Sequence, residues 1–411
     1  MPIVAAALVA TLMADPVVRA AVIAGTRSCA VAPATSVWRT PVASLPVAAD
    51  SAAMIAAIGA AAPLHPDFGA GLWDGGPIGI PITVVPHDQP RVHVAFTYAS
   101  ESDRVGYPIP RHPEIEGGPR STGDRHVLLL DRQTCVEYEL YDARPIAGSA
   151  SWTAGSGAVF DLRTNALRPA GWTSADAAGL AILPGLVRPE EIARGVIDHA
   201  IRVTVPATDA RFIWPARHEA GVADASLPPM GLRVRLKASV EIAGYPRVDR
   251  IILRALKTYG MIVADNGSPW YLSGVPSRAW NNDLLHELDG ITGSDFQVVD
   301  ESCLEVAPSS RGAAERVAAR HASDGPLRCT VTGPPAPARA SLRPGVQPAH
   351  TCRAALRRAR SPRPCRSWRS SVPWTPAMSG EAHRPTAPTT NAAAASSPAT
   401  TLPAPLGSDS P

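Results

Sequence analysis

Three side chains close to position 120 have the types and the spacing that acid–base catalysis requires. Glu116 precedes two glycines, and Asp124 and His126 alternate on a segment that leads into an apolar stretch. Residues two apart on a strand project to the same face, so we expect Asp124 and His126 to lie together. A carboxylate beside an imidazole could serve as acid and base in glycoside cleavage, or as metal ligands. The alternative is turn chemistry, with a carboxylate paired to Arg120 or Arg125; we assign no metal and no cofactor.

A second polar group follows at Arg168, Trp172 and Asp176, with His199 further along the chain. The stretch from Arg168 to Trp172 contains proline and glycine and is expected to be a loop. Tryptophan-bearing polar loops suit sugar sites, because the indole offers a flat apolar face to a pyranose ring. We therefore predict substrate binding by Arg168 and Trp172 and acid–base chemistry for Asp176. Alternatively, Asp176 belongs to a short capped turn and Trp172 fills the end of the core.

A third set combines cationic groups with an imidazole, a phenol and an indole: Trp214, Arg217, His218, Lys257 and Tyr259. β-Elimination of a uronic acid needs a cation to neutralise the carboxylate and a Tyr or His to move the α-proton. The set predicts a lyase, with His218 and Tyr259 as catalytic groups. Against it, the residues after Asp265 are typical of a tight turn, and Lys257 suits a solvated helix face. Trp270 is a further ring that could stack on a sugar.

Familiar catalytic signatures are missing from the sequence. It contains no GxSxG elbow, no HExxH helix, no P-loop and no GxGxxG. Serine hydrolase, zinc protease and nucleotide chemistries are therefore disfavoured.

The elements that must position these side chains are mostly short strands. β-Branched or alternating segments occupy Ile80–Val85, Val92–Tyr98, His126–Leu130, Val136–Tyr141, Ala200–Val205, Leu232–Ile242 and Met261–Ala264. Helical signals occupy Ser51–Ala61, Pro189–Val196, Val248–Lys257 and Asn281–Leu288. No repeating βαβ period is present, so the sequence predicts a mainly β fold, an antiparallel β-sandwich or a jelly roll with a few short helices.

Two strand segments carry finer predictions. Asp131 to Thr134 fits a hairpin turn between the neighbouring strands. In Leu232 to Ala238 the apolar residues alternate with Arg233, Arg235 and Lys237, which predicts a basic stripe on an outer face.

Composition divides the 411 residues into a body and a tail. Residues 307–411 hold 14 of the chain's arginines, 17 of its 43 prolines and no Ile, Phe or Tyr, which predicts a disordered tail. That tail carries a net charge of +10, whereas residues 1–306 carry −7 within the total of +3. The acidic body argues against a nucleic-acid enzyme. We interpret the arginine-rich tail as a solvated segment or as the product of a shifted reading frame.

The first residues and the cysteines bear on localisation. The apolar run Pro2–Ala14 has the length of a signal-peptide core but no preceding basic residue, and it is too short to span a bilayer. We expect residues 1–28 to act as a leader and residues 29–306 to form one β-rich globular domain. A disulfide between Cys29 and Cys135 would staple the start of that domain to the sheet; two separate buried thiols are the alternative.

Several strings are distinctive enough to suggest relatives. They include Leu64-His65-Pro66-Asp67-Phe68-Gly69, Ile115-Glu116-Gly117-Gly118, Gly123-Asp124-Arg125-His126, Arg168-Pro169-Ala170-Gly171-Trp172 and Trp214-Pro215-Ala216-Arg217-His218. Over residues 29–306 the chain resembles a group of secreted proteins from bacteria with GC-rich genomes, to which no activity is attached. The resemblance implies export and implies that the tail is an addition peculiar to this chain; it assigns no catalytic residue.

Together these features predict an extracellular carbohydrate-active protein. The favoured function is cleavage of a polysaccharide, by hydrolysis or elimination, with acid–base groups drawn from Glu116, Asp124, His126, Asp176, His218 and Tyr259. The alternative is a glycan-binding or cell-envelope protein without catalysis that stacks sugars on Trp172, Trp214, Trp270 and Tyr271. In both cases the expected partner is a glycan, with no nucleic acid and no stable membrane insertion.

Overall fold

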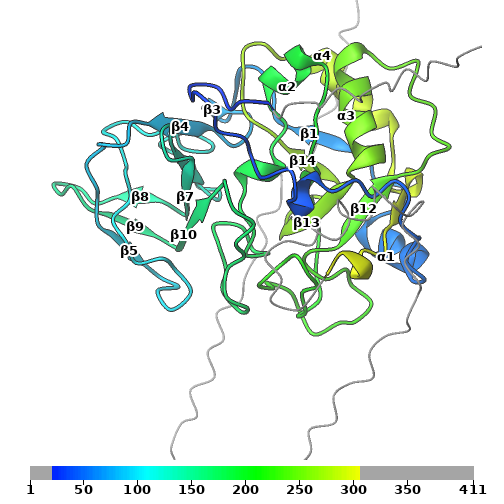
Figure 1. The fold of residues 1–411 in the computed structure, drawn as a ribbon, viewed down its shortest axis with the longest axis horizontal. Helices are drawn as coiled ribbons and strands as arrows, with labels where there is room; N and C mark the ends of the chain where they lie inside the picture. Colours follow the sequence, from blue (N-terminus) through cyan, green and yellow to red (C-terminus); the bar gives the residue numbers. More distant parts are fainter. Residues whose placement is uncertain (1–20, 306–411) are drawn as a thin grey trace, which may run out of the picture. The chain divides into compact units, whose positions relative to one another are not determined.

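The computed structural model describes residues 21–305, in which short strands form four sheets joined by long connections (Figure 1). A few short helices accompany them, so the mainly β prediction is confirmed. The predicted tail and most of the predicted leader lie outside the described residues.

The largest sheet has six strands in the order β1-β14-β11-β13-β12-β15. Their bounds are β1 (His65–Asp67), β14 (Tyr271–Ser273), β11 (Ile201–Val205), β13 (Met261–Asn266), β12 (Arg233–Leu236) and β15 (Phe296–Val298). The central strands β11, β12 and β13 are buried along most of their length. This sheet therefore carries the main hydrophobic core of the protein.

Helix α3 (Arg247–Thr258) packs beside β12 (Figure 1). Its buried residues Ile252 and Leu256 lie four positions apart on one face, as expected of an amphipathic helix. The other helices are α1 (Ser51–Ile58), α2 (Pro189–Arg194) and α4 (Asn282–Leu285), with 3₁₀ turns at Val37–Arg39, Leu183–Gly185, His286–Gly290, Gly293–Asp295 and Ser302–Leu304. All four predicted helices are thus confirmed, and three of them are shorter than predicted.

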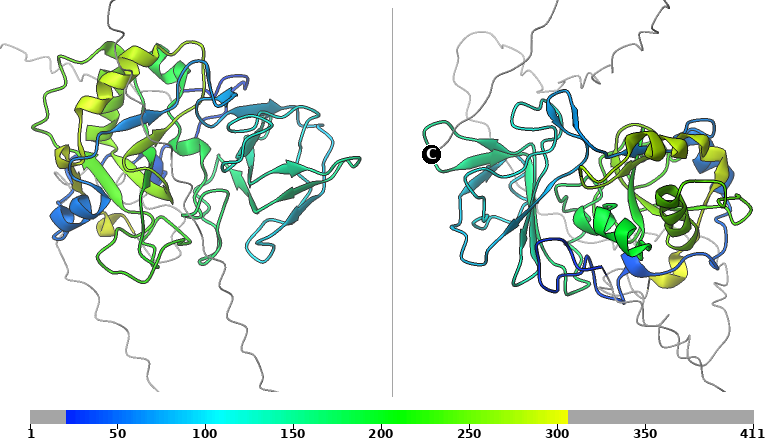
Figure 2. Two further views of the ribbon diagram at one scale, coloured as in Figure 1. Left: turned by 180° about the vertical axis from the view of Figure 1, so that it is seen from behind. Right: turned by 90° about the horizontal axis from the view of Figure 1, so that it is seen from above.

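A four-stranded sheet and a three-stranded sheet lie on one side of the six-stranded sheet (Figures 1 and 2). The first has the order β10 (Ser156–Asp161), β7 (Val136–Tyr141), β6 (Val127–Asp131) and β4 (Ile82–Val85). The second has the order β5 (Val94–Phe96), β9 (Trp152–Ala154) and β8 (Arg144–Pro145). The fourth sheet is the hairpin of β2 (Leu72–Trp73) and β3 (Gly76–Pro77).

The predicted hairpin turn between β6 and β7 is confirmed. Its strands pair antiparallel, and Asp131 Oδ1 accepts the backbone N–H groups of Gln133 and Thr134 at 2.9 and 3.0 Å. The Asp131 carboxylate therefore satisfies two donors that the turn exposes.

The prediction of a wholly antiparallel sandwich or jelly roll is not confirmed, because the sheets are mixed and do not close. Strands pair parallel in β1/β14, β11/β13, β4/β6 and β5/β9. Parallel neighbours need long connections, and the connection from β11 to β13 contains both β12 and α3. The pattern of residues along a strand does not show whether that strand pairs parallel or antiparallel with its neighbour.

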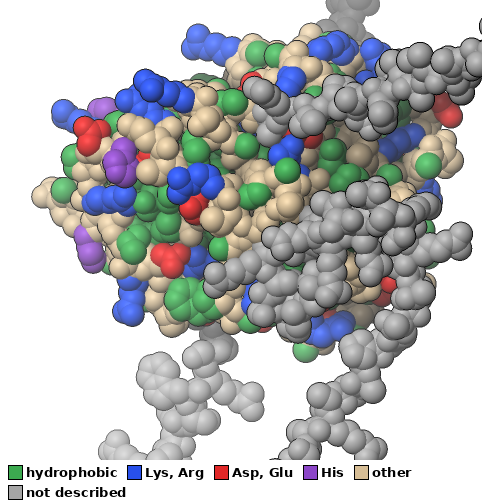
Figure 3. Space-filling view, in the orientation of Figure 1, with side chains coloured by type: hydrophobic (Ala, Val, Ile, Leu, Met, Phe, Trp, Pro, Cys, Tyr) green, Lys and Arg blue, Asp and Glu red, His purple; other side chains and the backbone are tan. Residues whose placement is uncertain are grey.

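The predicted basic outer stripe on β12 is wrong. Arg233 has no exposed surface: it forms an ion pair with Glu301 at 3.2 Å and donates to the Val37 carbonyl at 2.8 Å. Arg235 is likewise buried and donates to the Leu45 carbonyl. The N-terminal segment covers this face of the strand. The basic side chains that do reach the surface are interspersed with acidic ones on the face shown in Figure 3.

The predicted disulfide between Cys29 and Cys135 is present and joins residues 106 positions apart. It packs in a small apolar cluster with Ile23, Val31 and Leu183. Within residues 21–305, no helix combines the length and apolarity that crossing a bilayer requires.

Replacing both cysteines, Cys29→Ser with Cys135→Ser, tests what the disulfide contributes. Because the bridge closes a long loop, we expect the free energy of unfolding to fall by about 3–5 kcal/mol in urea titrations. Ser28→Ala, beside the bridge, serves as the control and should change little. Equal stability of the double variant and the natural chain would contradict the prediction.

Candidate functional site

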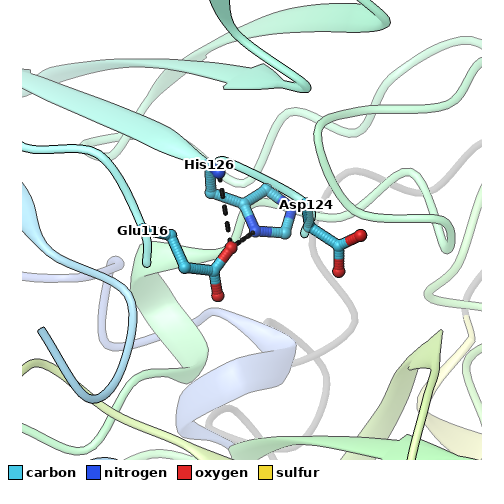
Figure 4. A group of neighbouring side chains, drawn as sticks. All are labelled: Glu116, Asp124 and His126. Carbon is cyan, nitrogen blue, oxygen red and sulfur yellow. Dashed lines mark hydrogen bonds and ion pairs between the residues drawn. The ribbon is translucent and has the colours of Figure 1, made fainter. Parts of the chain in front are cut away.

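Glu116 and His126 form an ion pair just before β6, in which His126 is buried and Glu116 is half-buried. His126 Nδ1 lies 2.6 Å from Glu116 Oε2, and His126 Nε2 lies 3.0 Å from the carbonyl oxygen of Ala175 (Figure 4). A carbonyl oxygen only accepts, so Nε2 carries a proton. Burial alone would lower the pKa of His126, but the charge and hydrogen bond of Glu116 raise it to about 10. His126 is therefore an imidazolium at neutral pH, and it holds the Glu116 carboxylate ionised.

Asp124 lies beyond the imidazole ring from Glu116, and its side chain is exposed (Figure 4). One ligand atom from each of Glu116, Asp124 and His126 lies within 4.8 Å of the others. The spacing would admit an ion, but both ring nitrogens of His126 already make hydrogen bonds. Coordination by His126 would therefore cost a proton and a hydrogen bond. The donor set fits acid–base chemistry better than metal binding.

A second charged group centres on Arg202, which lies on β11. Its guanidinium donates to both carboxylate oxygens of Asp176 at 2.9 and 2.7 Å, and to Ser273 Oγ at 2.7 Å. The same Nη2 that contacts Asp176 also lies 3.1 Å from Asp265 Oδ2. Arg202 and Asp176 are both buried. A buried charge of this kind is stable only when paired and hydrogen-bonded, and this one is.

Asp265 is a carboxyl group of the site whose surroundings favour the protonated form. Burial and the negative charge of Asp176 raise the pKa of Asp265, while the charge of Arg202 opposes them in part. Its Oδ1 accepts the backbone N–H of Asn266 at 2.8 Å. The side chain is 20% exposed, whereas that of Asp176 has no exposed surface. Asp265 can therefore hold a proton at a position that a ligand can reach.

The two charged groups act on each other and form one site. Burial would raise the pKa of Glu116, but the charge and hydrogen bond of His126, and then the charge of Arg202, lower it. The charge of Asp124 helps to raise the pKa of Asp265, after burial and Asp176. Burial, followed by the charges of Asp124 and Asp265, raises the pKa of Tyr141 to about 12. Residues from the β6, β7, β11 and β13 regions thus converge.

Asp67, an exposed residue on the edge strand β1, lies close enough to this site to interact electrostatically with it. Loss of water around it and then the charge of Glu116 raise its pKa, and Asp124 adds to the same effect. The site therefore contains five carboxyl groups around two buried cations: Asp67, Glu116, Asp124, Asp176 and Asp265 around His126 and Arg202. This excess of acids is why at least one of them favours the protonated form.

Two buried glutamates on β7 hold the loop that carries Asp176. Glu139 accepts the N–H groups of Ala175 and Ile182 at 3.1 and 3.0 Å, and Glu137 accepts that of Leu183 at 3.2 Å. Neither glutamate has exposed surface. Burial raises the pKa of both, that of Glu139 to about 7. The loop is therefore fixed from the four-stranded sheet, while Asp176 reaches Arg202 on the six-stranded sheet.

The structure places four other predicted residues together in the neighbouring loops. Arg168 forms an ion pair with Asp103 at 2.5 Å, and its guanidinium carbon lies 5.4 Å from the Trp172 ring centre. Arg217 donates to the Arg168 carbonyl oxygen at 2.9 Å. His218 Nδ1 lies 2.8 Å from the carbonyl oxygen of Ala177, the residue after Asp176. These side chains support the loop that carries Asp176.

The remaining predicted residues lie in other surroundings. Lys257 donates to the carbonyl oxygens of Ala238 and Val240, and Tyr259 directly follows α3. Trp214 is half-buried against the core. Trp270 has no exposed surface: it stacks on Phe296 and donates to the Gly59 carbonyl oxygen. The structure thus brings together Glu116, Asp124, His126 and Asp176, but not the whole third set.

Sequence reasoning missed Arg202 and Asp67, and it placed Asp265 beside the third set, where a tight turn was the first interpretation. One signal was available: Arg202 is the one charged residue in the otherwise β-branched β11 segment Ile201–Val205. A charge in such a strand must be paired, so it points to unseen carboxylates. Nothing in the sequence shows which carboxylates those are, because Asp176 and Asp265 lie far from Arg202 along the chain.

Comparisons with protein-family models, with curated proteins and with solved structures found no match to this chain. The site is therefore interpreted from its own geometry.

The paired glutamates on β7 predict how stability depends on pH. Because burial raises their pKa values above the ordinary 4.5, the folded protein holds protons that the unfolded chain releases. The stabilisation is complete below about pH 4.5 and is lost as the pH rises through about 7. We expect the melting temperature to fall over this range by circular dichroism, and Glu137→Gln to flatten the fall. Glu114→Gln, at an exposed position, should leave the slope unchanged, and an unaltered slope in Glu137→Gln would refute the explanation.

Proposed function

We propose that this protein is a secreted carbohydrate-active enzyme, a glycoside hydrolase whose general acid is Asp265. The observation that carries the proposal is the convergence of Asp265 and Asp176 on one nitrogen of a buried arginine, within electrostatic reach of the exposed Asp124. Glycoside hydrolysis requires one carboxyl group that retains a proton and a second that is ionised.

The proposed reaction uses the two carboxyl groups in complementary roles. Asp265 gives its proton to the glycosidic oxygen as the bond from that oxygen to the anomeric carbon breaks. Asp124 takes a proton from a water molecule, whose oxygen bonds to the anomeric carbon. The products are a reducing sugar and the released alcohol, and the proton on Asp124 returns to Asp265 through solvent.

Buried partners support both groups in this proposal. The Arg202 guanidinium pairs with Asp176, and the charge of Asp176 in turn favours the proton on Asp265. The Glu116–His126 pair fixes the backbone before β6, since the His126 N–H also donates to Glu116 Oε2 at 3.3 Å. Asp124 lies two residues away on that backbone.

Hydrolysis is favoured over elimination of a uronic acid. Elimination needs a cation free to neutralise the substrate carboxylate, but His126 and Arg202 are buried and paired with Glu116 and Asp176. The five surrounding carboxyl groups would also repel a polyuronate. Export is supported by the Cys29–Cys135 disulfide, because disulfides persist in oxidising compartments.

Activity on a panel of polysaccharides tests the assignment. We expect Asp265→Asn to lower the rate of reducing-end release by about 10²–10⁴-fold, because it removes the acid without changing the size of the side chain. In the natural enzyme, activity should decline as the pH rises and Asp265 loses its proton. Asp283→Asn, at an exposed position on α4, should retain full activity. Appearance of unsaturated uronic products instead would indicate a lyase, and release of reducing ends by Asp265→Asn at the natural rate would refute the role of Asp265.

A further inference from the structure

The β2–β3 hairpin presents two large apolar side chains to solvent. Trp73 is 79% exposed and Leu72 is 69% exposed, the highest values among the large hydrophobic residues described. Placing both in water has a cost in free energy, because the apolar surface stays unburied. Exposed apolar surface at a fixed position is typical of a binding site.

The turn of this hairpin fixes the backbone position of Trp73. Trp73 pairs with Gly76, so the loop contains only Asp74 and Gly75. Both have positive φ, 49° and 81°, which is the geometry of a type I′ turn. This turn matches the twist of the two strands, so the position of Trp73 on its strand is fixed.

The hairpin is anchored beside the candidate site. A side chain at Gly76 would come within 2.0 Å of the backbone of Gly117, so the two backbones are in direct contact. Gly117 is the residue after Glu116, and Gly118 packs on Gly76 as well. On its other side the hairpin follows β1, which ends at Asp67 of the site. The exposed ring therefore extends from an element fixed between two of the carboxyl-bearing segments.

We propose that Trp73 is a sugar-stacking residue that binds an uncharged glycan chain entering this site. The inference rests on the proposed function and adds a substrate class to it. The flat indole matches the C–H face of a pyranose ring, and the adjoining acidic site excludes polyuronates by repulsion. Leu72 extends the apolar surface along the same hairpin.

The proposal is tested by binding to the full-length Asp265→Asn protein, in which slow hydrolysis leaves the ligand intact. The probes are cellohexaose, mannohexaose, hexa-N-acetylchitohexaose and hexagalacturonate, measured by calorimetry and by quenching of tryptophan fluorescence. We expect at least one neutral probe to bind and the acidic probe not to bind. Adding Trp73→Ala should weaken binding about tenfold or more, while Trp73→Phe, which keeps a ring, should restore part of it.

Val222→Ala, at another apolar residue that is 60% exposed, is the matched control and should leave binding unchanged. Equal binding by Trp73→Ala and the parent protein, or absence of binding by every neutral probe, would overturn the proposal. A probe that binds through Trp73 but is not hydrolysed by the natural enzyme would refute the proposed hydrolase while leaving the stacking role in place. Concentration-dependent dimerisation lost in Trp73→Ala, without sugar binding, would assign the hairpin to a protein interface instead.

Discussion

The buried guanidinium of Arg202 is the interaction on which the arrangement of the site depends. A charge removed from water must be matched by partners, and Arg202 finds them on three separate segments: Asp176, Asp265 and Ser273. Each partner belongs to a different part of the chain. The contacts with Arg202 therefore fix the loop of Asp176, strand β13 and strand β14 relative to one another. The same requirement that stabilises the arginine therefore also positions the carboxyl groups.

The loop carrying Asp176 is held from two directions. The backbone N–H of Ala175 donates to Glu139, and the carbonyl oxygen of Ala175 accepts from His126. The side chain of the next residue, Asp176, accepts from Arg202. The first two contacts come from the four-stranded sheet and the last from the six-stranded sheet. Such a loop has little freedom to move independently of either sheet, which is what preorganised catalytic groups require.

The sequence was sufficient where neighbours along the chain decide the structure. The strand Val136–Tyr141 and the turn at Asp131 follow from alternation and from local side-chain hydrogen bonds. Glu116, Asp124 and His126 could likewise be grouped, because they are close in sequence. The parallel pairing of β11 with β13 and the burial of Arg233 could not be predicted in this way, since alternation defines two faces of a strand but not what covers them. Asp265 could not be grouped with these residues, because its contacts in the site are with residues far away in the sequence.

The distribution of charge in the site explains why Asp265 favours a proton. Asp176 receives two hydrogen bonds from Arg202, whereas Asp265 receives one longer contact from the same guanidinium. Two adjacent carboxylates cannot both remain ionised without a large cost, so the less stabilised one takes the proton. Asp265 is also the more exposed of the two. The geometry that pairs Asp176 with the buried arginine thus leaves the carboxyl group that favours a proton at the more exposed of the two positions.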